Sequence, residues 1–171
     1  MNLFSIIKKS SYYSINSNKL NFVDHESPSV CVDNAIPLLG WLMIEVDFLK
    51  IDISHDFFVY FDTGRINTSK RYYIPYKSNG SSKRILFTAS PIKVIRFDGL
   101  ETNLNKKIKG FRVVRLLPSF AIDRVVARLI NSDFNYRSFT KLQLKKSIKK
   151  DARHRSMSWK RLLLHKYDQT F

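Results

Sequence analysis

A change in the spacing of apolar residues constrains the fold of this chain more than any other feature. Between residues 40 and 117, short stretches alternate between apolar and polar side chains, which is the pattern of half-buried strands. After Pro118 the apolar residues recur at helical spacing. Pro118 suits this change, because proline cannot continue a central strand and is favoured in the first turn of a helix.

Six stretches carry the strand pattern at roughly ten-residue intervals, with no helical period between them. Such a series is typical of an antiparallel β-sandwich or jelly roll. Pro75 places one strand at a sheet edge or bulge, and Gly110 predicts a bulge or close backbone approach in another. The predicted strands are 41–49, 56–62, 71–76, 83–89, 92–97 and 107–116.

Three helices are predicted after Pro118, over residues 119–131, 137–150 and 156–167. The chain is therefore expected to be mostly β, with a sandwich followed by a basic helical tail. Its predicted parts are an irregular N-terminal segment packed on the sandwich (1–39), the sandwich (40–117) and a basic helical linker or tail (118–171).

The positive charge is concentrated in the last part of the chain. Residues 1–100 hold 12 Lys and Arg against 9 Asp and Glu, whereas residues 101–171 hold 18 against 5, out of a net charge of +16. A surplus of this size predicts contact with a polyanion, either nucleic acid or an anionic membrane surface. The alternative is a solvated helix face. The predicted contact residues are Lys145, Lys146, Lys149, Lys150, Arg153 and Arg155.

Motifs of known enzyme chemistry are missing from the sequence. The five glycines do not have the spacing of a phosphate-binding loop, and no Gly-x-Ser-x-Gly nucleophile turn occurs. We therefore predict a protein that is not an enzyme and needs no cofactor.

No metal site is predicted either. The four histidines share no metal-ligand spacing, and the single Cys31 can form neither an internal disulfide nor a metal quartet. Cys31 lies between two valines, which indicates a buried thiol. A divalent-ion site stays open as an alternative, because Asp52, Ser54 and Asp56 offer oxygen ligands. The other interpretation is that these three are ordinary loop residues.

Aromatic residues lie on both faces of the neighbouring predicted strands, so some rings are expected to face outward. Tyrosine can stack on the apolar face of a sugar or on a nucleobase. Tyr60, Tyr72 and Tyr76, with the adjacent Asp62, are therefore the candidate ligand-binding residues. The alternative is that these rings pack beneath other parts of the chain.

Residues 37–116 resemble the non-catalytic β-sandwich module, followed by a basic linker, of bacterial family-two glycosyltransferases that make surface polysaccharides. Short matches carry this resemblance, and they occur in the order that the family shows. They are PLLGW at 37–41, YFDTG at 60–64, IRFD at 95–98, FRVVRL at 111–116 and, after the linker, Tyr167 and Asp168.

The resemblance implies the front end of a glycosyltransferase-like protein without its catalytic part, because the chain ends at Phe171, where that part begins in the family. Such a product is either truncated or a stand-alone module, and no catalytic residue carries over. The implied function is binding of glycan or of a partner glycosyltransferase domain. The alternative is a small basic nucleic-acid-binding protein.

The sequence also predicts where the protein acts. No apolar run approaches the ~18 residues of a membrane-spanning helix. The first ten residues make a poor secretion signal, since their charges follow the apolar residues. A cytoplasmic protein is expected. If the basic tail contacts lipid, the protein is expected at the inner face of the membrane as a peripheral protein.

Overall fold

A computed structural model describes residues 12–16, 29–31, 38–48, 57–64, 70–76, 81–98 and 108–171. The chain divides into two compact units, residues 1–116 and residues 117–171. We call them the sheet unit and the helical unit, and each is described by itself.

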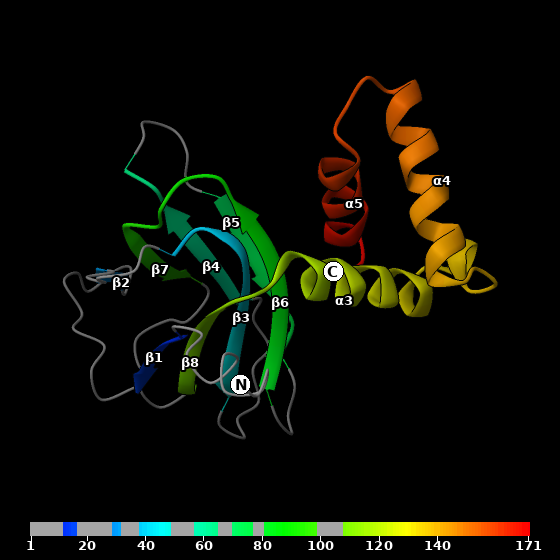
Figure 1. Ribbon diagram of the computed structural model, residues 1–171. Helices are drawn as coiled ribbons and strands as arrows, with labels where there is room; N and C mark the ends of the chain where they lie inside the picture. Colours follow the sequence, from blue (N-terminus) through cyan, green and yellow to red (C-terminus); the bar gives the residue numbers. More distant parts are fainter. Residues whose placement is uncertain are drawn as a thin grey trace, which may run out of the picture. The chain divides into compact units, whose positions relative to one another are not determined.

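The described residues of the sheet unit form two four-stranded sheets in which all neighbouring strands are antiparallel (Figure 1). The first sheet has the order β1 (Tyr12–Asn16), β8 (Ile108–Arg115), β3 (Gly40–Phe48) and β6 (Ser81–Thr88). The second has the order β2 (Ser29–Cys31), β7 (Val94–Asp98), β4 (Phe57–Asp62) and β5 (Lys70–Ile74).

The inward faces of both sheets share one hydrophobic core. In β3, Leu42, Ile44 and Val46 are completely buried, as the alternating pattern of this strand predicts. Buried residues of β4, β5 and β7 belong to the same cluster. Because alternate residues of each strand face this core, the side chains between them lie on the outer faces of the sheets.

Phenylalanine rings join the two sheets through the core. Phe48 of β3 meets Phe57 of β4 edge to face, with ring centroids 5.4 Å apart. Phe97 of β7 meets Phe111 of β8 in the same way at 4.9 Å. Such pairs add to the free energy gained by burying the rings.

Side chains also connect β5 and β6, which are edge strands of different sheets. The Ser82 hydroxyl donates a hydrogen bond to the carbonyl of Pro75, and Arg84 Nη1 donates one to the carbonyl of Tyr73 at 2.6 Å. Ser82 and Arg84 are both buried. These two bonds connect the edge of one sheet to the edge of the other.

Both predicted strand interruptions are confirmed. In the pairing of β3 with β8, Asp47 lies opposite Gly110, and the register shifts between Asp47 and Phe48. A Cβ on Gly110 would lie 3.4 Å from Asp47 Oδ2, which is an ordinary van der Waals distance, so the bulge rather than a close backbone approach is what the structure shows. Pro75 follows β5, which is an edge strand.

The prediction of a mostly β chain, a sandwich or jelly roll with a helical tail, is wrong. Helices of 15, 14 and 10 residues form a compact unit of their own, so helix and strand make up comparable shares of the residues that the structure describes. Short helices are marginally stable alone, and here the three helices are stabilised because they bury their apolar faces against one another. In addition, β1 and β2 are strands within the segment that was expected to be irregular.

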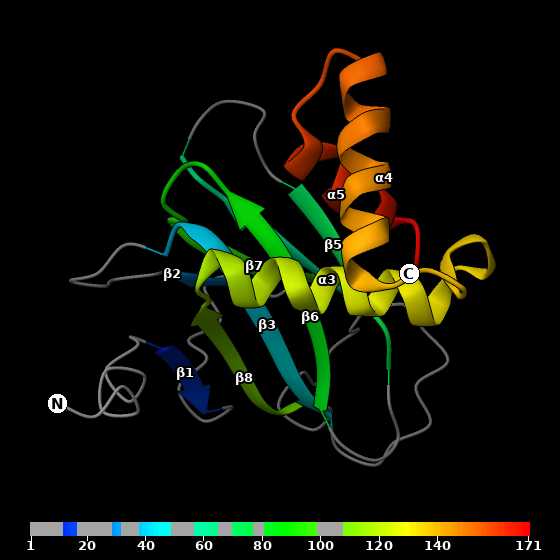
Figure 2. The same cartoon turned by 45° about the vertical axis from the view of Figure 1, so that its right-hand side comes forward.

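The helical unit consists of α3 (Pro118–Ser132), a short 3₁₀ turn η2 (Phe134–Tyr136), α4 (Lys141–His154) and α5 (Trp159–Asp168). Within this unit α4 and α5 lie side by side with reversed chain direction, and α3 crosses them (Figure 2). The three helices share a core, whose buried residues are Ala121, Val125, Val126, Leu129, Leu144, Ile148, Ala152, Leu162, Leu163 and Tyr167.

Local signals set where α3 and α4 begin. Pro118 occupies the first turn of α3. In front of α4, Thr140 Oγ1 accepts the backbone N–H of Gln143 at 3.2 Å, and Gln143 Oε1 accepts the N–H of Thr140 at 2.8 Å. This capping box explains why α4 begins at Lys141 rather than at the predicted residue 137.

Within the described part of the chain, no helix combines the length and the apolar character needed to cross a membrane.

Candidate functional site

Helix α4 has two faces of opposite character. Leu144, Ile148 and Ala152 are at most 1% exposed and pack into the core of the helical unit. The opposite face carries exposed cations at positions i, i+3, i+4 and i+7, which lie above one another on a helix. We call this face the basic stripe, and it consists of Lys146, Lys149, Lys150 and Arg153.

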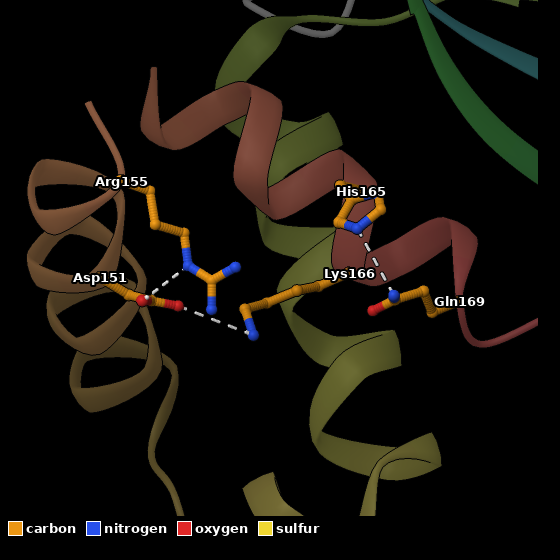
Figure 3. Close-up of polar contacts among 5 residues, drawn as sticks. All are labelled: Asp151, Arg155, His165, Lys166 and Gln169. Atoms are coloured by element: carbon orange, nitrogen blue, oxygen red, sulfur yellow. Dashed lines mark hydrogen bonds and ion pairs between the residues drawn. The ribbon is translucent and has the colours of Figure 1, made fainter. Parts of the chain in front are cut away.

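The acidic residues that lie near α4 are bound to other cations. Lys145 Nζ lies 2.5 Å from Asp123 Oδ1, which connects α4 to α3. Asp151 pairs with Arg155 Nε at 3.1 Å and with Lys166 Nζ of α5 at 3.8 Å (Figure 3). In the helical unit, which the structure describes throughout, no ion pair joins a stripe cation to an acid. The positive field of the stripe is therefore not cancelled by neighbours.

The six basic residues predicted from the sequence thus separate into two groups. Four of them form the stripe. Lys145 and Arg155 instead pair with Asp123 and Asp151 inside the helical unit. The structure therefore brings four of the six together as a polyanion contact and gives the other two an internal role.

The pairing of Lys145 changes the acidity of its partner. Lys145 donates a hydrogen bond to Asp123 and lies beside it, and the more distant Lys141 adds to the effect, so the pKa of Asp123 lies below its ordinary value. Partial desolvation opposes this effect. Asp123 is accordingly negative at neutral pH, and its charge is compensated by Lys145.

A hollow of about 370 Å³ lies where α4 turns into α5. Trp159 forms part of its wall, and Lys149 Nζ lies 5.2 Å from the centroid of the indole ring. Lys149 and Arg153 belong to both the hollow and the basic stripe, so the two features are continuous. The lining residues are Lys149, Ala152, Arg153, Met157, Ser158 and Trp159.

Trp159 was not among the site residues predicted from the sequence, where it falls within the predicted helix 156–167. The useful signal in the sequence was that Trp159 follows Lys149 and Arg153 after only a few residues. It could be interpreted only with the end of α4 and the start of α5 known, because the reversal between them brings these residues together.

The four candidate ligand residues of the sheet unit do not form one site. Tyr72 is 8% exposed and belongs to the core, where its ring packs against Phe61 at 5.6 Å. Tyr76 packs against the same core, with its ring 5.2 Å from that of Phe48. Both rings therefore pack within the sheet unit, as the packing alternative expects, and a ligand role for Tyr72 and Tyr76 stays a prediction.

Tyr60 and Asp62 lie on the outward side of β4. The alternate residues Val59 and Phe61 face the core, so the side chains next to them in the strand point the other way. Tyr60 is half-buried. Asp62 accepts the N–H of Gly64 at 2.7 Å and pairs with Arg96 at 3.0 Å, so its carboxylate is already engaged within the sheet unit.

The candidate metal ligands Asp52, Ser54 and Asp56 lie outside the described residues, as does the side chain of Cys31. Among the residues that are described, no group of three or more His, Cys, Asp or Glu side chains gathers in a way that would hold a metal ion.

Comparison of the chain with protein-family models, with curated proteins and with solved structures gave no match. The resemblance to the accessory module of glycosyltransferases therefore remains a prediction from short sequence motifs.

Proposed function

We propose that this protein binds nucleic acid, with the basic stripe of α4 contacting the phosphate backbone. The observation that carries the proposal is the arrangement of Lys146, Lys149, Lys150 and Arg153 on one exposed face, while the nearby Asp123 and Asp151 are paired with other cations. Side chains from Lys146 to Arg153 follow the helix for about 10 Å at 1.5 Å per residue. At about 3.4 Å of axis per phosphate on one strand of a duplex, this length spans about three phosphates.

The exposed face of α4 fits phosphates better than a lipid bilayer. A helix that lies in a membrane surface buries an apolar face among the lipid chains. The apolar face of α4 is already used in the protein core, and Leu142 is the exposed large apolar residue of this helix. The stripe therefore offers charge without an apolar anchor, which suits binding to a nucleic-acid backbone. The cytoplasm, expected from the sequence, is a compartment where this partner is present.

The salt dependence of binding tests the proposal. Affinity for labelled 20-nucleotide single strands and 20-base-pair duplexes is measured by fluorescence anisotropy over a range of salt concentrations. If all four stripe cations contact phosphates, log affinity falls with log salt with a slope of about −2.8 for single strands or −3.6 for duplex. A slope near zero contradicts the proposal.

A matched pair of double variants locates the contact. Lys146→Gln with Lys150→Gln removes two stripe charges, and we expect the slope to become shallower by about 1.4 to 1.8. Lys93→Gln with Lys109→Gln removes the same charge from exposed positions of the sheet unit. Equal effects of both variants would show that net charge, rather than the stripe, causes binding.

Vesicles containing anionic lipid form the second arm of the test. Flotation of the protein with these vesicles, together with failure to bind either nucleic acid, would replace the proposal with a membrane contact.

Glycan binding by the sheet unit is the weaker proposal. Of its four expected residues, only Tyr60 and Asp62 lie on an outward face. Calorimetry with bacterial surface polysaccharides tests it, since an outward Tyr60 could stack on a sugar ring. Binding that Tyr60→Ala abolishes would support this function, and no heat of binding would remove it.

A further inference from the structure

We propose that the hollow between α4 and α5 receives an unpaired nucleobase of a single strand whose phosphates lie on the basic stripe. This inference rests on the proposed function and adds a preference for single-stranded over duplex nucleic acid.

The walls of the hollow combine two kinds of chemistry. Trp159 and Met157 supply an indole ring and a flexible thioether, while Lys149 and Arg153 supply positive charge at the same site. A ligand that satisfies both walls needs a flat, weakly polar ring with an anion attached nearby. A nucleotide unit within a strand has this composition, because every base has a stackable face and every unit a phosphate.

The size and position of the hollow agree with this ligand. Its volume of about 370 Å³ lies within the range of about 300–1,000 Å³ that is usual for small-molecule sites. Since Lys149 and Arg153 also belong to the basic stripe, a strand whose phosphates contact the stripe passes directly beside Trp159.

A duplex cannot use the hollow in the same way. Its bases are stacked inside the helix, whereas bases of a single strand can turn outward and stack on an aromatic side chain. Trp159 is half-buried and its ring already attracts the Lys149 ammonium. We expect this ammonium to contact the phosphate of the bound unit while the base stacks against the indole.

The fluorescence of Trp159 provides a direct test. The chain has two tryptophans, and Trp41 is buried in the sheet unit beside Phe87. In full-length protein carrying Trp41→Phe, Trp159 is the sole indole reporter. We expect single-stranded oligonucleotides to quench its emission at saturation, and a duplex of the same length to bind without this quenching.

Trp159→Leu tests the energetic contribution, since leucine keeps an apolar side chain but has no ring to stack on. Stacking of one base corresponds to about a 5- to 150-fold change in affinity. We expect a loss in this range for single strands and no loss for duplex. Phe134→Leu is the matched control, because Phe134 is 79% exposed and also lies under a cation, Arg137, but it precedes α4 rather than lining the hollow.

The outcomes separate this inference from the proposed function. Equal quenching by duplex and single strand, or equal loss of affinity in Trp159→Leu and Phe134→Leu, would overturn the base site and leave phosphate binding by the stripe in place. Quenching by a free nucleoside monophosphate with the affinity of the strand would also overturn it, in favour of a mononucleotide site. Absence of binding to both nucleic acids would refute both proposals.

Discussion

Lys145 and Lys146 are neighbours on α4 that we predict to have opposite roles. Lys145 is partly buried, and its ammonium lies 2.5 Å from Asp123 of α3. Lys146 is exposed on the basic stripe. Replacing either by glutamine removes one charge from the same helix and keeps most of the side-chain length, so each variant is a control for the other.

The structure sets the expected size of the two effects. If Lys146 contacts one phosphate, Lys146→Gln makes the salt slope shallower by about 0.7 for a single strand or 0.9 for a duplex. Lys146→Gln should leave the thermal midpoint of unfolding unchanged, as is usual for exposed positions without a specific partner. Lys145→Gln should lower that midpoint, because it leaves Asp123 without its partner, and should leave the slope unchanged.

Anisotropy titrations at four or more salt concentrations, with thermal unfolding followed by circular dichroism, measure both quantities on the same preparations. Equal slope changes in the two variants would refute the separation of the six basic residues into a contact surface and internal ion pairs. So would a lower midpoint in Lys146→Gln with none in Lys145→Gln.

Four further results are expected. The carboxyl group of Asp123, followed by NMR, should titrate below its ordinary pKa of 3.8 in the native chain and closer to 3.8 in Lys145→Gln. Because folding lowers this pKa, the pair stabilises the folded protein fully at pH values above the unfolded pKa. That stabilisation is lost as the pH falls through the pKa of the folded protein. Phe97→Ala should lower the free energy of unfolding of the sheet unit by about 3 to 5 kcal/mol in a denaturant titration, since it leaves a cavity among rings that join the two sheets. Phe134→Ala, at a position that is 79% exposed, should change stability by less than about 0.5 kcal/mol. Thr140→Ala should cost about 1 kcal/mol through loss of the cap of α4, seen as a lower thermal midpoint of the helical unit.

The strands with the clearest alternation could be predicted from the sequence. The stretch 41–49 corresponds to β3 (Gly40–Phe48) and 56–62 to β4 (Phe57–Asp62), because burial of one face imposes a period of two. The short strand β2 (Ser29–Cys31) was missed, since three residues are too few to establish a period. Its pairing with β7 is a long-range contact that local pattern does not encode.

The roles of the tyrosines could not be predicted, for a related reason. Alternation shows that neighbouring rings lie on opposite faces, but it does not show which face is inward. Tyr60 faces outward and Tyr72 inward because their strands pair with a particular register, in which Tyr72 lies opposite Val59 and Tyr60 opposite Arg71. That register depends on partners distant in sequence.

The position of the aromatic residues also bears on the choice between the two functions that the sequence left open. Most aromatic residues lie in the nearly neutral part of the chain, whereas proteins that bind single strands place rings among basic residues. Taken from the sequence alone, that distribution favours glycan binding. The fold changes the comparison, because Tyr72 and Tyr76 are used in the core of the sheet unit, while Trp159 lies against Lys149 and beside Arg153. A single ring beside cations of one exposed surface is better placed for a nucleotide than rings packed into a core, and this is why we propose the nucleic-acid function.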